Sequence, residues 1–348
     1  MPDSPLSLLD PSVPLEAELD AQALRTLTFK RYETAPRRTS AANQVFWLAP
    51  TVPDLAKLPR LVALTCHGRL GEADVASLFA QAATHGWLQR LTVMHCALGR
   101  IPDEVARLRR LYRLSLVRDG LREAPTALGS LSSLRSLDLS GNPLERVDPA
   151  LRALSSLHTL RVGGAPSEPA TIETLPIVAS VRALSLGWMP ALRTPLTHWP
   201  ALTSLALHGD VGASGCPPEL GELTGLTSLA LAYSKRPTVP SSVRGLRALR
   251  ALWLPYSEIT ALPDWLGELP SLRALALHGA EHLEPDRLVD AVLALPGLVR
   301  IELPFPFPAS SRARLKKAGF RALVANPSAM LRVSVEAEAG IDPFPEIR

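Results

Sequence analysis

The sequence is poor in several features, and each shortage excludes a class of protein. Only three cysteines, Cys66, Cys96 and Cys216, occur in 348 residues, with no C-x-x-C pair, so neither a disulfide framework nor a four-cysteine zinc site is indicated. No run of about 18 apolar residues is available to span a bilayer. Residues 1–20 are acidic and interrupted by proline, whereas a secretory signal begins with basic residues and continues as an apolar run. We therefore expect a cytoplasmic protein with no membrane partner, the alternative being secretion without a cleavable signal.

Aromatic residues and lysines are scarce as well. Phe, Trp and Tyr make up 5% of a chain that is 47% hydrophobic, so the core must be built from aliphatic side chains, chiefly leucine. The net charge of +4 is carried almost wholly by arginine, in a composition rich in alanine, leucine and proline that fits a GC-rich genome. Because that bias explains the basic balance, we do not expect a nucleic-acid partner.

What the sequence has in abundance is a repeat. In residues 111–157, the leucines at 111, 114 and 116 recur 23 residues later at 134, 137 and 139. When the first leucine of each such unit is counted as position 1, twelve units begin at Leu24, Leu61, Leu88, Leu111, Leu134, Leu157, Val181, Leu202, Leu226, Leu249, Leu272 and Leu298. The period and the pattern L-x-x-L-x-L-x-x-N are typical of a leucine-rich repeat.

The spacing of the leucines predicts the geometry of each unit. Positions 4 and 6 lie two residues apart, so in an extended strand both point inward while positions 3, 5 and 7 point outward. A single unit cannot bury its leucines, so each turn must stack on its neighbours. Proline at position 15 begins the return half of the turn in five units, at Pro102, Pro125, Pro195, Pro240 and Pro263. We predict an α/β repeat solenoid, a leucine-rich-repeat horseshoe with a parallel concave β-sheet of about twelve strands.

The departures from the period predict the domain boundaries. Residues 1–23 are a leader and amino-terminal cap, 24–303 the leucine-rich repeats, and 304–348 a carboxyl-terminal cap and tail. About fourteen extra residues before Leu61 read as an insertion or cap extension, and helices are expected at 72–86 and 285–295. The sequence PFPFP after Leu303 cannot donate to a sheet ladder, so we expect it to end the array and blunt its edge. The tail offers a basic helix at 311–318 and a strand at 331–336.

Position 9 normally holds an asparagine whose amide bonds the backbone of adjacent turns. Only Asn142 is asparagine here, and Asp119 and Cys96 are polar or small substitutes. Apolar residues at this position cannot form the same bonds, so Ala165 and Met189 predict locally irregular turns.

The motifs of common enzymes are absent too. The sequence has no P-loop, no G-x-G-x-x-G after a strand, no H-E-x-x-H and no G-x-S-x-G. Cys66, His67, His95 and Cys96 come from adjacent repeats, but the two cysteines fall at inward and position 9 sites, so the four are not expected to converge on a metal. We expect no enzyme, no cofactor and no metal, with an enzyme of unrecognised site as the least favoured alternative.

The outward face, read from positions 3, 5, 7 and 8 of each repeat, predicts a binding surface with two parts. The first half of the array is basic and would suit an acidic surface of a partner; its arginines are Arg90, Arg113, Arg118 and Arg161. The second half repeatedly places scarce aromatic residues, together with histidines, at these positions: Trp188, His208, Tyr233, Trp253, Tyr256, His278 and Phe305. Exposed Trp, Tyr and Arg dominate binding hot spots. The alternative is that these side chains lie flat on neighbouring strands and merely cover the sheet.

The repeats, LxxLxLxxN followed by IP, VP or LP and then xxVxxL or xxLxxL, resemble the 23-residue class of leucine-rich-repeat proteins of bacteria and of intracellular plant and animal adaptors. They also resemble the repeat domains of bacterial type III effectors, some of which carry a ubiquitin-ligase domain. Such a ligase needs a separate helical domain with a nucleophilic cysteine, and no cysteine follows Cys216. The resemblance implies a non-enzymatic scaffold that recognises another protein through its concave face, or alternatively a bacterial effector that acts on a host protein by binding it.

Overall fold

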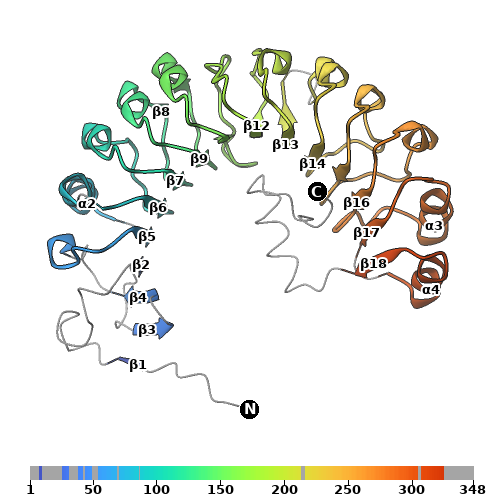
Figure 1. Cartoon of the computed structure of the whole chain (residues 1–348), viewed down its shortest axis with the longest axis horizontal. Helices are drawn as coiled ribbons and strands as arrows, with labels where there is room; N and C mark the ends of the chain where they lie inside the picture. The colour runs from blue at the N-terminus through green and yellow to red at the C-terminus, as the bar shows by residue number, and fades with distance from the viewer. Residues whose placement is uncertain are drawn as a thin grey trace. The chain divides into compact units, whose positions relative to one another are not determined.

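The computed structural model describes residues 54–324, apart from 69, 86, 213–215 and 305–306, and four earlier strands at 8–9, 26–30, 38–41 and 44–48. Only the backbone is described for those four strands and for 321–324. The chain divides into two compact units, residues 1–180 and 181–348. In each unit the strands line one side of the coil and short helices the other (Figure 1). Within the described residues, no helix is long and apolar enough to cross a membrane.

The repeats of the first unit form parallel strands in the predicted register. Each strand begins at position 3 of its repeat, and the position 4 leucines, such as Leu91, Leu114 and Leu137, pair across neighbouring strands and are buried. The strands are β5 (Ala63–His67), β6 (Arg90–Met94), β7 (Arg113–Val117), β9 (Ser136–Ser140) and β11 (Thr159–Gly163). Burial alternates along β6 and β7 as the period of two requires.

The residues before the third repeat form the edge of the first unit's sheet. The strand order is β1-β3-β4-β2-β5, with β1 (Leu8–Leu9), β2 (Thr26–Lys30), β3 (Arg38–Ala41) and β4 (Gln44–Leu48). Strand β4 pairs parallel with β2, and β3 pairs antiparallel with β4. The extra residues before Leu61 therefore add two strands outside β2 instead of a loop between β2 and β5.

The second unit is a parallel sheet in simple chain order. Its strands are β12 (Ala183–Met189), β13 (Ser204–Val211), β14 (Ser228–Ala232), β15 (Ala251–Trp253), β16 (Ala274–Ala276), β17 (Arg300–Leu303) and β18 (Arg321–Val324). Strand β18 pairs with β17 along all four residues. The expectation that the sheet ends at Leu303 is therefore wrong, because the proline-rich segment leads into a further turn. The strand expected at 331–336 lies outside the described residues.

The return half of a regular turn is a short 3-10 helix. All five predicted prolines are the residue just before such a helix, where a fixed φ and a missing N–H are tolerated. The helices are η1 (Leu55–Lys57), η2 (Asp103–Arg107), η3 (Thr126–Ser130), η4 (Pro149–Ala153), η5 (Leu196–His198), η6 (Pro218–Glu222), η7 (Ser241–Gly245) and η8 (Asp264–Glu268).

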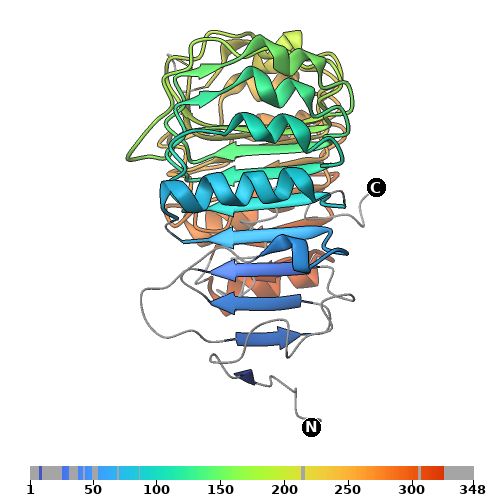
Figure 2. The same cartoon turned by 90° about the vertical axis from the view of Figure 1, so that its left-hand side faces the viewer.

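In the longer repeats, an α-helix replaces the 3-10 helix of the return segment. Helix α2 (Glu72–Thr84), prominent in Figure 2, buries Leu78 and Phe79 completely. Helices α3 (Pro285–Leu293) and α4 (Ala309–Lys317) do the same in the second unit, where Val289 and Leu315 are fully buried. The three expected helices are confirmed, because the extra residues give the return segment enough length for α-helical turns.

Two ion pairs of opposite polarity join neighbouring return segments of the first unit. Strands β8 (Glu123–Ala124) and β10 (Arg146–Val147) form a small parallel pair. Arg122 bonds Glu145, while Arg146 Nη2 lies 2.6 Å from Glu123 Oε2. The order Arg-Glu in one repeat thus faces Glu-Arg in the next.

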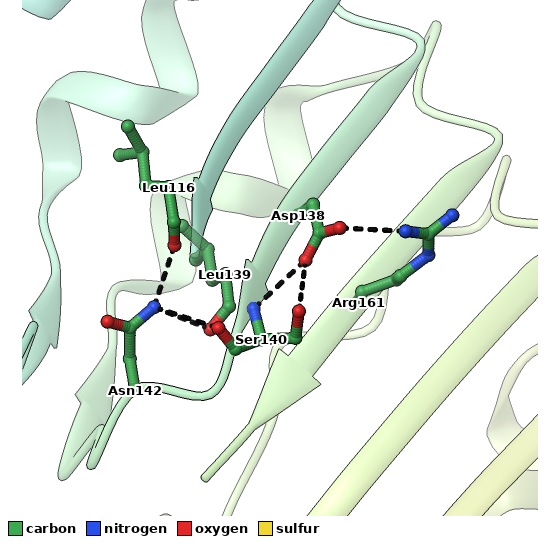
Figure 3. A network of polar contacts seen from close by, with 6 residues as sticks. All are labelled: Leu116, Asp138, Leu139, Ser140, Asn142 and Arg161. Atoms are coloured by element: carbon green, nitrogen blue, oxygen red, sulfur yellow. Dashed lines mark hydrogen bonds and ion pairs between the residues drawn. The ribbon is translucent and has the colours of Figure 1, made fainter. Parts of the chain in front are cut away.

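The side chain of Asn142 connects two adjacent repeats of the first unit. Its Oδ1 accepts from the backbone N–H groups of Asp119 at 2.8 Å and Leu121 at 3.2 Å. Its Nδ2 donates to the carbonyl oxygens of Leu116 at 2.7 Å and Leu139 at 2.9 Å (Figure 3). Because all these groups are buried, the side chain replaces bonds that water cannot supply.

Asp119 continues this ladder with a carboxyl group. Its Oδ1 accepts from Cys96 N at 2.8 Å, while its buried Oδ2 has no hydrogen-bond partner among the described residues. Burial raises the pKa of Asp119 to about 6. Burial also raises the pKa of Cys96 to about 12, so this thiol is not a thiolate nucleophile.

The irregular turns expected where position 9 is apolar are present. Ala165 forms an isolated antiparallel bridge with Glu168. The pairing of β12 with β13 shifts register between Gly187 and Met189, and Gly212 N donates to Met189 O at 2.9 Å. Backbone pairing therefore takes over where no side-chain amide is available.

Candidate functional site

The residue that leaves each strand, at position 8, has a left-handed backbone in most repeats. Glycine occupies it in four of them, with positive φ at Gly68, Gly141, Gly209 and Gly279. Five other repeats place a bulky residue there, each costing about 1–2 kcal/mol in this conformation. These residues are His95 (φ 55°), Arg118 (53°), Trp188 (41°), Tyr233 (55°) and Tyr256 (51°).

Three of these bulky side chains lie across the glycine of the following repeat. A Cβ added to Gly209 would stand 2.3 Å from Trp188 Nε1, and one added to Gly279 would stand 2.4 Å from Tyr256 Cδ1. At Gly141 the same Cβ would stand 2.4 Å from Arg118 Cγ. Glycine is therefore needed at these places for space as well as for backbone conformation.

The position 8 aromatic residues of the second unit form a row on the concave face, the side of the sheet away from the helices. We define the aromatic row as Trp188, Tyr233 and Tyr256. The ring centroids of Trp188 and Tyr233 lie 5.5 Å apart, and those of Tyr233 and Tyr256 lie 5.1 Å apart at an interplanar angle of 8°. Tyr233 and Tyr256 are 37% and 36% exposed, and Trp188 is half-buried. The row thus offers accessible aromatic surface across several strands.

The structure buries three other predicted residues of this surface, Trp253, His208 and His278, which corrects the expectation that the whole set is exposed. Trp253 is 2% exposed because it packs among alanines of its own and neighbouring strands, including Ala230 and Ala276. His208 is 8% exposed, with its ring 6.5 Å from that of Trp188. For these residues the covering interpretation holds. Phe305 lies outside the described residues.

His278 and Glu302 form a buried polar pair at one end of the aromatic row. His278 is fully buried, 5.2 Å edge-on from the Tyr256 ring, and its Nδ1 lies 3.8 Å from Glu302 Oε1. Burial lowers the pKa of His278 to about 4 and raises the pKa of Glu302 to about 7. Near pH 6 the pair is therefore neutral, and it does not present a charge to a partner.

The predicted arginines of the first unit fall into two groups. Arg113 and Arg118 are exposed and Arg90 is half-buried, and none of the three is in an ion pair within the described residues. Arg161 differs, because its Nη1 lies 2.7 Å from Asp138 Oδ2 and its side chain is only 16% exposed (Figure 3). The expectation of an accessible Arg161 is wrong, since the neighbouring repeat supplies its counter-charge.

No metal site assembles in the described part of the chain. No group of three or more His, Cys, Asp or Glu side chains there is placed to hold a metal ion. His67 and His95 do meet, with ring centroids 5.3 Å apart, whereas Cys66 is buried.

Sequence reasoning missed the glycines that accommodate the bulky residues. The available signal was the column of residues at position 8, in which glycine alternates with large side chains. It also missed Glu302, for which an outward carboxylate at position 5 beside His278 was the only sign.

Comparisons with known proteins found similarity among solved structures only. No family model matches the chain, and no curated protein sequence matches it. Among solved structures, a leucine-rich-repeat protein of Leptospira interrogans is 17% identical, over 79% of this chain and 93% of that one, with a TM-score of 0.41. An internalin of Listeria monocytogenes is 17% identical over 78% and 82% of the two chains, with a TM-score of 0.42.

A third similar structure is TLR13 in complex with a single-stranded RNA. It is 16% identical over 79% of this chain and 45% of that one, with a TM-score of 0.49. Since all three TM-scores lie below 0.5, the fold assignment depends on this chain's own evidence. Its repeated leucines, its parallel strands beginning at position 3 and its Asn142 ladder make it a leucine-rich-repeat solenoid.

Proposed function

We propose that this chain is a scaffold that binds another protein through its concave face, with the aromatic row as the anchor. The observation that carries the proposal is that Trp188, Tyr233 and Tyr256 occupy left-handed backbone positions where glycine is the relaxed residue. Bulky residues in such conformations persist where the surrounding structure holds them, and they cluster at functional sites.

The exposure of the row supports recognition over simple covering of the sheet. Trp253 covers the strands from position 5 without a positive φ and is almost completely buried. Tyr233 and Tyr256 instead keep more than a third of their surface exposed while stacked on each other. Because stacking fixes the rotamers of the two tyrosines, these side chains would lose little conformational entropy when a partner binds. Trp and Tyr are also enriched among binding hot spots.

The test replaces the three residues of the row by glycine. Trp188→Gly, Tyr233→Gly and Tyr256→Gly each remove a ring and relieve a strained backbone, so the free energy of unfolding should change by only about 1 kcal/mol per site. Affinity capture from the native cell with wild-type and triple-variant protein identifies partners that depend on the row. The partner's affinity, measured with purified components, should fall by more than about tenfold.

The matched control is Trp87→Ala. Trp87 is 58% exposed, lies outside the concave face and has the Arg110 guanidinium 4.9 Å from its ring centroid. The substitution therefore removes exposed aromatic surface from another part of the protein, on the first unit. A specific partner that binds the triple variant as tightly as wild type, or that is lost equally with Trp87→Ala, would show that the aromatic row is not the binding site.

A further inference from the structure

We propose that the first unit carries a second, independent binding site, in which Arg90, Arg113 and Arg118 bind an extended acidic segment of a protein. This site shares no residue with the aromatic row, and it goes beyond the function proposed above.

The strand register places the site on two adjacent strands. Arg90 of β6 and Arg113 of β7 are direct neighbours at position 3, and Thr92 and Ser115 are neighbours at position 5. Arg118 follows β7 at position 8. Arg113 and Arg118 are thus five residues apart, or about 16 Å along an extended chain, with the Ser115 hydroxyl between them.

Among the described residues of the unit, the three guanidinium groups have no counter-charge. Among the outward positions of β5, β6, β7, β9 and β11, the only carboxylate belongs to Asp138. That carboxylate is already engaged, by Arg161 at 2.7 Å and by the Ser140 hydroxyl at 2.6 Å. Like charges directly opposite each other on neighbouring strands are destabilising, so Arg90 and Arg113 carry an electrostatic cost that a bound anion would relieve.

Arg118 is held in place at a cost of its own. It has a φ of 53°, and its backbone N–H donates to Ser140 O at 3.1 Å. Its side chain crosses Gly141, yet it remains exposed. The same strained position that carries the aromatic row in the second unit therefore presents a guanidinium here. Guanidinium groups bind carboxylates through two parallel hydrogen bonds.

The distribution of charge favours a protein segment over a nucleic acid. The basic residues span two strands about 5 Å apart, and the next strand presents the Asp138 carboxylate. Among the described side chains, they therefore form no long basic track for a chain of phosphates. No Phe, Tyr or Trp stands at an outward position of β5 to β11 for bases to stack upon. An extended segment with acidic residues about four or five positions apart matches the separation of Arg113 and Arg118.

The experiment measures fluorescence anisotropy of a labelled octapeptide in which two glutamate pairs are separated by serine and glycine. The full-length protein should bind this peptide at low salt and lose affinity as salt is raised. Replacing Arg90, Arg113 and Arg118 by glutamine should weaken binding by more than about tenfold, because charge-assisted hydrogen bonds are lost. The control variant replaces Arg107, Arg109 and Arg152, exposed on the helix side, by glutamine, which removes the same charge.

The outcomes separate the alternatives. Equal affinity for a peptide with glutamine in place of glutamate, or an equal loss in the two triple variants, would overturn the proposal. So would tighter binding of a single-stranded oligonucleotide that depends on the same three arginines, which would assign the site to nucleic acid. The triple glycine variant of the aromatic row should bind the glutamate peptide like wild type, so failure of either proposal can be recognised without the other.

Discussion

The two units build the same turn but satisfy its buried backbone in different ways. In the first unit, Asn142 and Asp119 bond the backbone of adjacent repeats through their side chains. In the second unit, Met189 and Ala280 occupy position 9 as buried apolar residues, and beside Met189 the longer strands β12 and β13 supply backbone pairs. The leucine framework is common to both, so position 9 is where a repeat can vary without losing its fold.

The outward positions differ between the units in a parallel way. The first unit presents arginines and hydroxyl groups, whereas the second presents an aromatic row above buried alanines and Trp253. Each places bulky side chains at left-handed position 8 residues, Arg118 in the first unit and the aromatic row in the second. At the strand exit, the two units therefore differ in side-chain chemistry while sharing the same left-handed backbone conformation.

The largest effect should come from the framework that both units share. Leu137→Asp in the first unit and Leu229→Asp in the second each place a charge at a fully buried site, and each should reduce the free energy of unfolding by about 4 kcal/mol or more. Urea denaturation measures the loss. Arg135→Asp, at an exposed neighbouring residue, should cost less than about 1 kcal/mol, and an equal loss there would contradict the assigned register.

The ladder should matter in the first unit and little in the second. Asn142→Ala leaves two backbone N–H groups and two carbonyl groups unsatisfied and should cost about 3 kcal/mol. Ser257→Ala removes one bond, from its hydroxyl to Leu254 O at 2.8 Å, and should cost about 1 kcal/mol. If thermal unfolding shows that Asn142→Ala and Ser257→Ala lose equal stability, position 9 does not contribute differently in the two units.

Asp119 makes the first unit sensitive to pH. Its pKa rises from 3.8 to about 6 on folding, so the folded state binds the proton more tightly than the unfolded state. The resulting stability is fully present below about pH 4 and is lost as the pH rises through 6. Asp119→Asn restores an amide that stays neutral and can donate, so it should stabilise the protein at pH 7 by about 2 kcal/mol.

The measurement for Asp119 is the free energy of unfolding at several pH values between 4 and 8. Wild type should lose stability relative to Asp119→Asn as the pH rises across this range. A difference between the two proteins that does not change with pH would mean that the carboxyl is already ionised in the fold.

The smallest effect isolates the crowding around the aromatic row. Gly209→Ala and Gly120→Ala introduce the same methyl group at φ values of 65° and 70°, but only the first meets a side chain, the Trp188 ring. Both should lose about 1 kcal/mol from backbone strain, and Gly209→Ala about 1 kcal/mol more. Tryptophan fluorescence should change only in Gly209→Ala, and an identical response of the two variants would show that the ring does not depend on this glycine.

Most of the fold was predictable because one period governs it. The repeats assigned from Leu24 to Leu298 each contain a strand that begins at position 3. Strand β18 escaped because its repeat has Gly319 where a leucine was expected, and because the prolines before it indicated an end. The pairing of β4 outside β2 escaped because strand order at a sheet edge is decided by packing that a local pattern does not contain.

The site was less predictable than the fold. The repeat register correctly predicted that Trp253 and His278 point outward. Their burial depends on side chains from other repeats, such as the alanines around Trp253, which a single repeat does not show. The ion pair of Arg161 with Asp138 required knowing which side chains meet across adjacent strands. Backbone conformation at position 8 had a visible sign in Gly141, Gly209 and Gly279, and it is the feature on which both binding proposals depend.

The crossed ion pairs on the helix side bear on how this array could have grown. Individually, exposed pairs such as Arg122–Glu145 and Arg146–Glu123 stabilise little, less than about 1 kcal/mol. Their polarity reverses from one repeat to the next, so a tandem copy of residues 111–133 alone would set Arg122 against a second Arg122 and Glu123 against a second Glu123. Duplication of the two repeats together would preserve the alternation. The crossed pairs therefore belong to the two turns jointly, and neither turn alone carries a pattern that could pair with its own copy.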